Sequence, residues 1–182
     1  ILKNYSYDKY TTITDNLQLQ YWPIQNLFIK GNLAITKQID RDEAFLSASS
    51  SNFDNVTDSK EKGSFTTLNG NTVDLKGQLN ISYNDNFFEK LYMSAGIGSE
   101  FSISKSTSDG YTATGFLNDK LTHPSFAQQF KKNSIPSGSY SKKKQIGFYG
   151  NLNLNWDNRY ILDGTIRADG SSLFGRESRF AP

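Results

Sequence analysis

The chain has 182 residues and a net charge of +2, so its charge indicates neither a nucleic-acid groove nor a polybasic membrane anchor. It contains no Cys, which excludes disulfides, thiolate metal sites and Cys nucleophiles. Apolar residues make up 36% of the chain, and no run of them approaches the roughly 18 residues of a membrane helix. A β-barrel span stays open, because its signal is alternation.

Alternation of apolar and polar residues is the main signal along the chain and predicts an all-β fold of antiparallel strands. It is clearest from Val73 to Asn84, where odd positions are apolar or Gly and even positions are polar. Each predicted strand reaches the roughly 9 to 11 residues that cross hydrocarbon, whereas soluble strands average about five or six. In chain order, the expected strands cover residues 11–21, 27–39, 72–84, 91–104, 145–156 and 160–169.

Short and long connections alternate along the chain between these strands. Residues 22–26, 85–90 and 157–159 are short, whereas residues 40–71 and 105–144 are long and polar. Structureless loops of that length are uncommon in soluble domains. Outer-membrane barrels have short periplasmic turns and long extracellular loops. The order of connections therefore favours a transmembrane barrel wall over a soluble antiparallel sheet, which would also alternate.

Aromatic residues gather beside the short turns, where one membrane interface would fall. Tyr and Trp favour such interfaces because one end of the side chain is apolar and the other forms hydrogen bonds. Aromatic residues that simply flank hairpins are the alternative reading. The residues concerned are Tyr21, Trp22, Tyr83, Phe87, Phe88, Tyr92, Trp156 and Tyr160.

Successive residues of a strand point to opposite sides, so each strand has an apolar parity and a polar parity, each made of every second residue. The two parities imply two faces of a barrel wall. We expect the polar parity to face the lumen or a plug, at Lys76, Asn80, Asn151, Asn153 and Arg167. We expect the apolar parity to face lipid, at Leu75, Leu79, Ile81, Leu152, Leu154, Trp156, Leu162 and Ile166.

Residues that carry chemistry are sparse. His123 is the only His, so the chain has too few His residues for a multi-histidine metal site and offers a single candidate for the His of a Ser-His-Asp triad. Gly96-Ile97-Gly98 lacks the third Gly of a phosphate loop and lies inside an alternating strand. Carboxylates of the polar parity more simply line a lumen or pair with basic neighbours. We expect no enzyme, no metal site and no cofactor, and no residue is identifiable as a substrate contact.

Residues 146–162, from Ile146 to Leu162, and the following segment Arg167-Ala168-Asp169-Gly170-Ser171-Ser172-Leu173-Phe174-Gly175 resemble the SusC/RagA family of TonB-linked outer-membrane transporters. Gly170 can adopt positive φ, and the Asp and Ser side chains can bond nearby backbone, so the segment suits a turn. The motif positions are Arg167, Asp169, Gly170, Ser171, Ser172, Phe174 and Gly175.

The resemblance implies that residues 1–182 are one partial domain of a plugged outer-membrane barrel of about 22 strands. It also implies an N-terminal plug that is not in this chain, energy supplied through TonB, and a SusD-like surface lipoprotein as partner. The cargo would be glycans, oligosaccharides or peptides, and nucleic acid would be no partner. A passive porin without energy coupling and a soluble sugar-binding β-sandwich are the alternatives.

The start of the chain, Ile1-Leu2-Lys3-Asn4, reads like the interior of a protein, so we expect a fragment. Six strands alone would leave two unpaired edges in lipid, which a bilayer does not tolerate. We therefore expect the remaining strands of the barrel to come from a longer polypeptide or from other chains.

Overall fold

The computed structural model describes residues 4–88, 90–173 and 180–181, and they form an all-β fold. Three short 3-10 helices lie in the connections, at Ser51–Phe53, Ser59–Glu61 and Pro124–Phe126. No helix among these residues is long and apolar enough to cross a membrane. The strands are β1 (Tyr5–Ile24), β2 (Leu27–Leu46), β3 (Ser64–Phe87), β4 (Leu91–Thr114), β5 (Gln129–Phe130), β6 (Ser137–Trp156), β7 (Tyr160–Ser171) and β8 (Phe180–Ala181).

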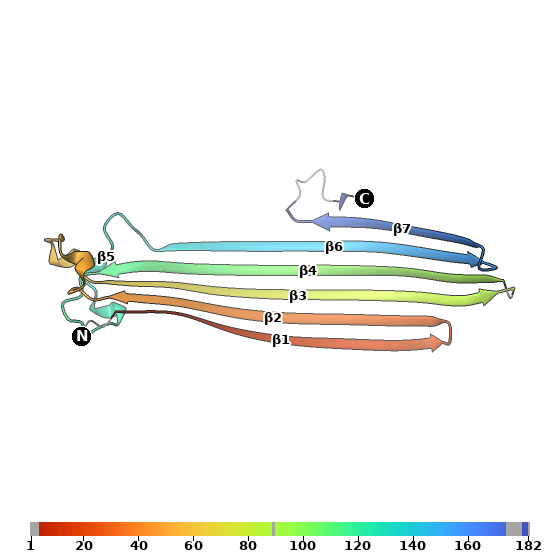
Figure 1. The fold of residues 1–182 in the computed structure, drawn as a ribbon, viewed down its shortest axis with the longest axis horizontal. Coiled ribbons are helices and arrows are strands. Elements are labelled where there is room, and N and C mark those ends of the chain that lie inside the picture. The colour runs from red at the N-terminus through yellow and green to blue at the C-terminus, as the bar shows by residue number, and fades with distance from the viewer. Residues whose placement is uncertain (1–3, 89, 174–179, 182) are drawn as a thin grey trace. The chain divides into compact units, whose positions relative to one another are not determined.

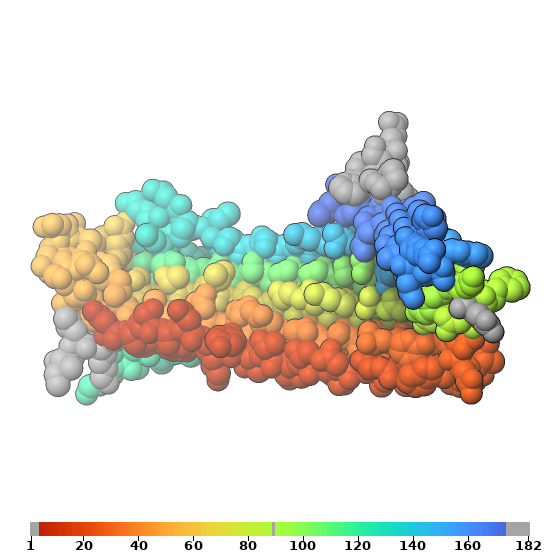
Figure 2. Space-filling model, turned by 45° about the vertical axis from the view of Figure 1, so that its right-hand side comes forward, coloured from red at the N-terminus to blue at the C-terminus, as the bar shows by residue number. Residues whose placement is uncertain are grey.

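The strands form one antiparallel sheet in the order β1-β2-β3-β4-β6-β7-β8, and the short β5 pairs with β4 (Figure 1). Each long strand thus lies beside the next long strand along the chain. β1, drawn in red at the lower edge in Figures 1 and 2, pairs only with β2 in the described part of the chain. One edge of this sheet therefore presents unpaired backbone groups.

The chain divides into two compact units. The loop unit comprises Ile1–Ile13, Lys37–Thr72 and Ser106–Ser141, and it contains the long connections. The hairpin unit comprises Thr14–Thr36, Val73–Lys105 and Lys142–Pro182, and it contains the short turns.

The hairpin unit has two distinct faces, as the alternation predicts. In the β6–β7 pairing, Leu154 is opposite Leu162, and Gly150 is opposite Ile166. Residues directly opposite each other in an antiparallel pair project to the same side of the sheet. The apolar parities of β6 and β7 therefore share one side, here called the apolar face, and the polar parities share the polar face.

The backbone conformation of the turn between β6 and β7 suits the Asp and Asn residues that form it. Asp157 and Asn158 have φ of 55° and 52°, in the left-handed region that Asp and Asn tolerate better than other residues with a Cβ. The Arg159 amide donates to the Trp156 carbonyl at 3.0 Å, and the Asp157 amide donates to the Lys90 carbonyl at 2.7 Å. The turn is thereby fixed to the segment that precedes β4.

The loop unit has a small aromatic core. Phe45, Phe65 and Phe116 are buried, and the rings of Phe45 and Phe116 meet edge to face at 5.2 Å. Phe116 reaches this core because the amides of Gly115 and Phe116 donate to the Lys62 carbonyl at 3.0 and 3.1 Å. Both long connections are therefore packed against each other and against the core.

The strands extend beyond their expected bounds in the loop unit. β2 continues to Leu46, β3 begins at Ser64, β4 continues to Thr114 and β6 begins at Ser137. The connections expected at 40–71 and 105–144 shrink to 47–63 and 115–136, apart from the two residues of β5. Apolar alternation misses these extensions because polar side chains bridge the strands there, as in the Thr66–Thr112 hydroxyl pair at 3.0 Å.

Candidate functional site

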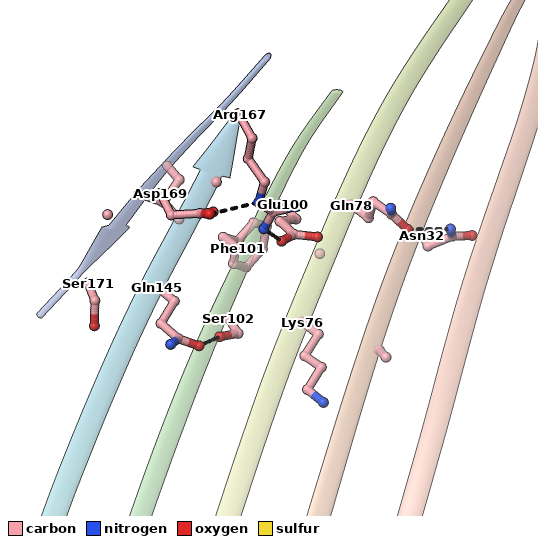
Figure 3. A pocket seen from close by; sticks show the side chains of 15 residues that line it. Asn32, Lys76, Gln78, Glu100, Phe101, Ser102, Gln145, Arg167, Asp169 and Ser171 are labelled. Atoms are coloured by element: carbon pink, nitrogen blue, oxygen red, sulfur yellow. Dashed lines mark hydrogen bonds and ion pairs between the residues drawn. The ribbon is translucent and has the colours of Figure 1, made fainter. Parts of the chain in front are cut away.

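A cavity of about 640 Å³ lies against the polar face of the hairpin unit (Figure 3). Five strands contribute to it, from β2 to β4 and then β6 and β7. Its volume is within the usual range of ligand pockets, about 300 to 1,000 Å³. The polar side chains that line it are Asn32, Lys76, Gln78, Glu100, Ser102, Gln145, Arg167, Asp169 and Ser171.

Arg167 joins two carboxylates at this cavity. Its guanidinium pairs with Glu100 of β4, and its Nε donates to Asp169 Oδ2 at 2.7 Å (Figure 3). A Cβ at Gly147 of β6 would lie 2.6 Å from Asp169 Oδ1 and 3.1 Å from Arg167 Nη2. Because Gly147 has no Cβ, the side chain from β7 can cross β6 and reach β4.

Tyr149 crosses a strand in the same way. Its hydroxyl donates to Asn80 Oδ1 and accepts from Gln78 Nε2 at 3.1 Å, and both partners are on β3. To reach them from β6 the ring lies over β4, where a Cβ at Gly98 would be 2.3 Å from the Tyr149 Cζ atom. Asn32 of β2 extends the chain of polar contacts, donating to Gln78 Oε1 at 3.4 Å.

The residues expected to face a lumen are all on this polar face, and the structure brings several of them together. Lys76 and Arg167 line the cavity, and Asn80 bonds to Tyr149. Asn151 lies over Gly96, and Asn153 donates to Asp163 of β7. Their exposure to a barrel lumen stays a prediction.

The segment from Arg167 to Gly175, which resembles the SusC/RagA family, lies partly beside the cavity. Arg167, Asp169, Gly170 and Ser171 line it. Ser172 instead closes the β6–β7 pairing, since its amide donates to the Lys144 carbonyl and its hydroxyl accepts from the Lys144 amide, both at 2.9 Å. Phe174 and Gly175 lie outside the described residues.

The residues expected to face lipid share the apolar face. Two shallow cavities of about 630 and 510 Å³ lie on it, lined by residues that include Leu79, Ile81, Leu152 and Ile166. Leu162 and Ile166 are 61% and 74% exposed, so no described part of the chain covers these side chains. Leu75, Leu154 and Trp156 have the same parity in their strands. Contact with lipid stays a prediction for all eight positions.

The sequence analysis did not predict that the Tyr149 ring would lie over Gly98. A weak signal was present, because Gly96 and Gly98 occupy two successive polar-parity positions where a side chain would be expected. Among the described residues, no group of three or more His, Asp or Glu side chains is placed to hold a metal ion. The polar face therefore offers hydrogen bonds and paired charges.

Solved transporters contain the same fold. The RagAB peptide transporter matches 98% of this chain with a TM-score of 0.87 and 21% identity, and its open-open state matches with 0.86 and 20%. The siderophore receptor PiuA from Acinetobacter baumannii matches 97% of the chain with 0.55 and 12%. No family model matches the chain, and no curated protein does.

The chain spans only 19% of the length of the RagAB chain it matches, and 28% of the PiuA chain. At such low identities the likeness shows the fold alone. That fold is an antiparallel stretch of barrel wall, in agreement with the fold class expected from alternation.

Proposed function

We propose that this chain is part of the barrel wall of an outer-membrane importer of the SusC/RagA family. The observation that carries the proposal is the match of 98% of the chain to a peptide transporter at a TM-score of 0.87. The motif from Arg167 to Ser172, which resembles that family in sequence, supports it independently. In this role the chain is a structural and transport element, not an enzyme, and it needs no cofactor.

The two faces of the hairpin unit support a place in the membrane. A bilayer has no water to bond exposed backbone groups, so strands cross it only in closed barrels. The bare apolar face suits lipid, and the polar face, with its cavity and its Arg167 ion pairs, suits the lumen. The unpaired edge at β1 would then join further strands of the full barrel.

Peptides are the cargo we favour, with oligosaccharides second, because the transporter whose fold this chain shares at a TM-score of 0.87 is a peptide transporter. Uptake would be energised through TonB and assisted by a SusD-like lipoprotein. We expect cells carrying the full-length protein to accumulate a fluorescent peptide mixture, and to lose that uptake when TonB is deleted. Uptake that persists without TonB would instead indicate a passive porin.

The lipoprotein partner has a separate test. The full-length protein, purified from native outer membranes in mild detergent, is expected to retain a lipoprotein in equimolar amount. A matched purification from cells that lack the transporter controls for contaminants. Recovery of the transporter with no lipoprotein would count against this partner and leave the barrel itself untouched.

A further inference from the structure

Three lysines interrupt the apolar face at the end of the hairpin unit that lies away from the short turns. Lys105 ends the part of β4 that belongs to this unit, and Lys142 begins the part of β6. Both have the apolar parity of their strands, as does Lys144. These three side chains, here called the lysine cluster, are exposed, and none of them takes part in the function proposed above.

The register of β4 and β6 places two of these lysines opposite each other. Two side-chain contacts between the strands fix the register, Ser102–Gln145 at 3.2 Å and Ser108–Ser139 at 2.8 Å. In an antiparallel pair, each step forward on one strand is matched by a step back on the other. Lys105 and Lys142 lie midway between the two contacts and are therefore directly opposite each other.

This arrangement concentrates positive charge. Directly opposite residues project to the same side of a sheet, and like charges in these positions are destabilising. Lys144 projects to the same side about 7 Å further along β6. Neither Lys142 nor Lys144 forms an ion pair with any residue that the structure describes. In the hairpin unit, the apolar parities of β4 and β6 also contain no Asp or Glu.

Apolar surface begins directly beside the lysine cluster. In the same register Ile103 is opposite Lys144, and the next pair toward the short turns is Phe101 with Ile146, each 39% exposed. The shallow cavity of about 510 Å³ on this face begins at Phe148, roughly 13 Å from Lys144 along β6. A cationic end followed by an apolar groove is complementary to a molecule with an anionic head and a hydrocarbon tail.

We propose that the lysine cluster binds the phosphate headgroup of a phosphorylated lipid whose acyl chains lie along the apolar face. A phosphate monoester carries about −1.5 to −2 charges at pH 7, and its oxygens accept the hydrogen bonds that Lys ammonium groups donate. An anion between Lys105 and Lys142 would also remove their mutual repulsion. The aliphatic stems of the lysines can cover apolar surface while the ammonium groups reach the headgroup.

This inference rests on the proposed function in one respect, since it requires the apolar face to lie in lipid. It adds the chemical class of the lipid and its position. Outer-membrane barrels have their short turns on the periplasmic side. The lysine cluster, at the other end of the hairpin unit, would therefore lie at the outer interface of the membrane.

The experiment is native mass spectrometry of the full-length protein in a detergent without charge. Phosphatidic acid is the probe, because its headgroup is a phosphate monoester. Phosphatidylcholine, which has the same acyl chains and no net charge, is the comparison lipid, and inorganic phosphate is the competitor. We expect saturable binding of phosphatidic acid, much weaker binding of phosphatidylcholine, and no displacement of phosphatidic acid by an equal concentration of phosphate.

Paired substitutions locate the binding. Lys142→Gln combined with Lys144→Gln is expected to weaken phosphatidic acid binding about tenfold or more, because two cations are lost from the site. Lys30→Gln combined with Lys143→Gln is the matched control, since it removes the same charge from the polar parities of β2 and β6. Lys142→Arg combined with Lys144→Arg keeps the charge. Both of these variants are expected to bind as wild type does.

A second measurement separates a lipid site from a general effect of charge. In phosphatidylcholine vesicles, Lys142→Gln is expected to raise the urea midpoint of the full-length protein, because it removes the repulsion with Lys105. In vesicles that also contain phosphatidic acid, this gain is expected to disappear or reverse, because the wild type then has a bound phosphate that the variant holds less well.

Four results would overturn the proposal: phosphatidic acid binds no tighter than phosphatidylcholine, the two paired Gln variants bind equally well, phosphate displaces the lipid at equal concentration, or the Lys142→Gln midpoint shift is the same in both kinds of vesicle. Displacement by phosphate would assign the lysine cluster to free anions. Failure of the importer proposal has a different sign, namely peptide uptake that does not depend on TonB, so the two failures are distinguishable.

Discussion

Two glycines of the hairpin unit mark the points where a polar side chain crosses a neighbouring strand. Gly98 lies under the ring of Tyr149, and Gly147 lies under the ion pairs of Arg167. Alternation predicts which side of the sheet these residues occupy, but it contains no information on contacts two strands away. The polar face was therefore predictable from the sequence, whereas its network of contacts was not.

Gly98→Ala tests the first crossing. The new Cβ would lie 2.3 Å from Tyr149 Cζ, so the ring must move and lose its bonds to β3. We expect a cost of about 1 to 3 kcal/mol in the free energy of unfolding, typical of overpacking, measured by urea unfolding of the full-length protein in vesicles. Gly164→Ala is the control, since nothing lies within 4 Å of a Cβ there. An equal cost of Gly98→Ala in a Tyr149→Ala background would contradict the account.

The Glu43 carboxylate predicts a pH dependence of the loop unit. Burial, the largest single influence, opposes its charge, but the hydrogen bonds from Tyr7 and Arg41 and the nearby positive charge of Arg41 act the other way, and the net effect holds the pKa of Glu43 below its usual 4.5. A carboxyl with a lowered folded pKa stabilises the fold above its unfolded pKa, and this contribution disappears as pH falls through the folded pKa.

We therefore expect β2 and β4 of the loop unit to have higher hydrogen-exchange protection in the wild type than in Glu43→Gln at neutral pH. The difference is expected to shrink only as pH falls below about 4.5. Protection factors, which correct for the intrinsic exchange rate, are the measurement. A difference that stays constant down to acid pH would show that the Glu43 charge contributes nothing.

Ile166 and Thr165 are adjacent, exposed and on opposite faces of β7, so they form a matched pair. In a bilayer, Ile166→Arg is expected to cost about 2 to 4 kcal/mol near the midplane and less toward an interface. Thr165→Arg, at the same depth on the polar face, is expected to cost far less. Unfolding of both full-length variants in vesicles measures the difference, and equal costs would show that the facing is wrong.

At the scale of elements, β6 and β7 form the hairpin that the sequence predicts best. Residues 145–156 and 160–169 alternate, apart from the apolar Ile161 between Tyr160 and Leu162, and the structure pairs Trp156 with Tyr160 through to Gln145 with Ser171. The extensions of β2, β3 and β4 into the loop unit were not predictable by the same signal. Their buried positions mix Phe45 and Phe65 with polar side chains such as Glu43, which interrupts the period of two in hydropathy.

Introduced cysteines test the β6–β7 register directly, since the chain has none of its own. Asn151 and Thr165 are directly opposite each other, and such residues lie about 4.5 to 5.5 Å apart between their Cα atoms, within disulfide range. The pair Asn151→Cys with Thr165→Cys should cross-link under mild oxidation. The diagonal pair Asn153→Cys with Thr165→Cys, about 7 to 8 Å apart, should cross-link poorly. A reversed preference would mean a shifted register.

At the scale of the whole molecule, the chain matches a fraction of a longer solved transporter chain. It spans 19% of the RagAB chain that it matches, and the sheet of the described residues presents an unpaired edge at β1. Alternation together with the order of short and long connections predicted this class of fold, because both follow from the geometry of a barrel. No residue pattern here has a spacing specific to a ligand, so the expectations about cargo and partners came from the family resemblance alone.

The most direct test of the account is the lipid exposure of β7 in the full-length protein in outer-membrane vesicles. Single cysteines at Leu162, Asp163, Gly164, Thr165 and Ile166 would carry spin labels, and their relaxation by oxygen, which concentrates in lipid, would be measured. We predict high oxygen accessibility at Leu162, Gly164 and Ile166 and low accessibility at Asp163 and Thr165. Uniform accessibility, or the opposite alternation, would contradict a barrel wall with its apolar face in the membrane.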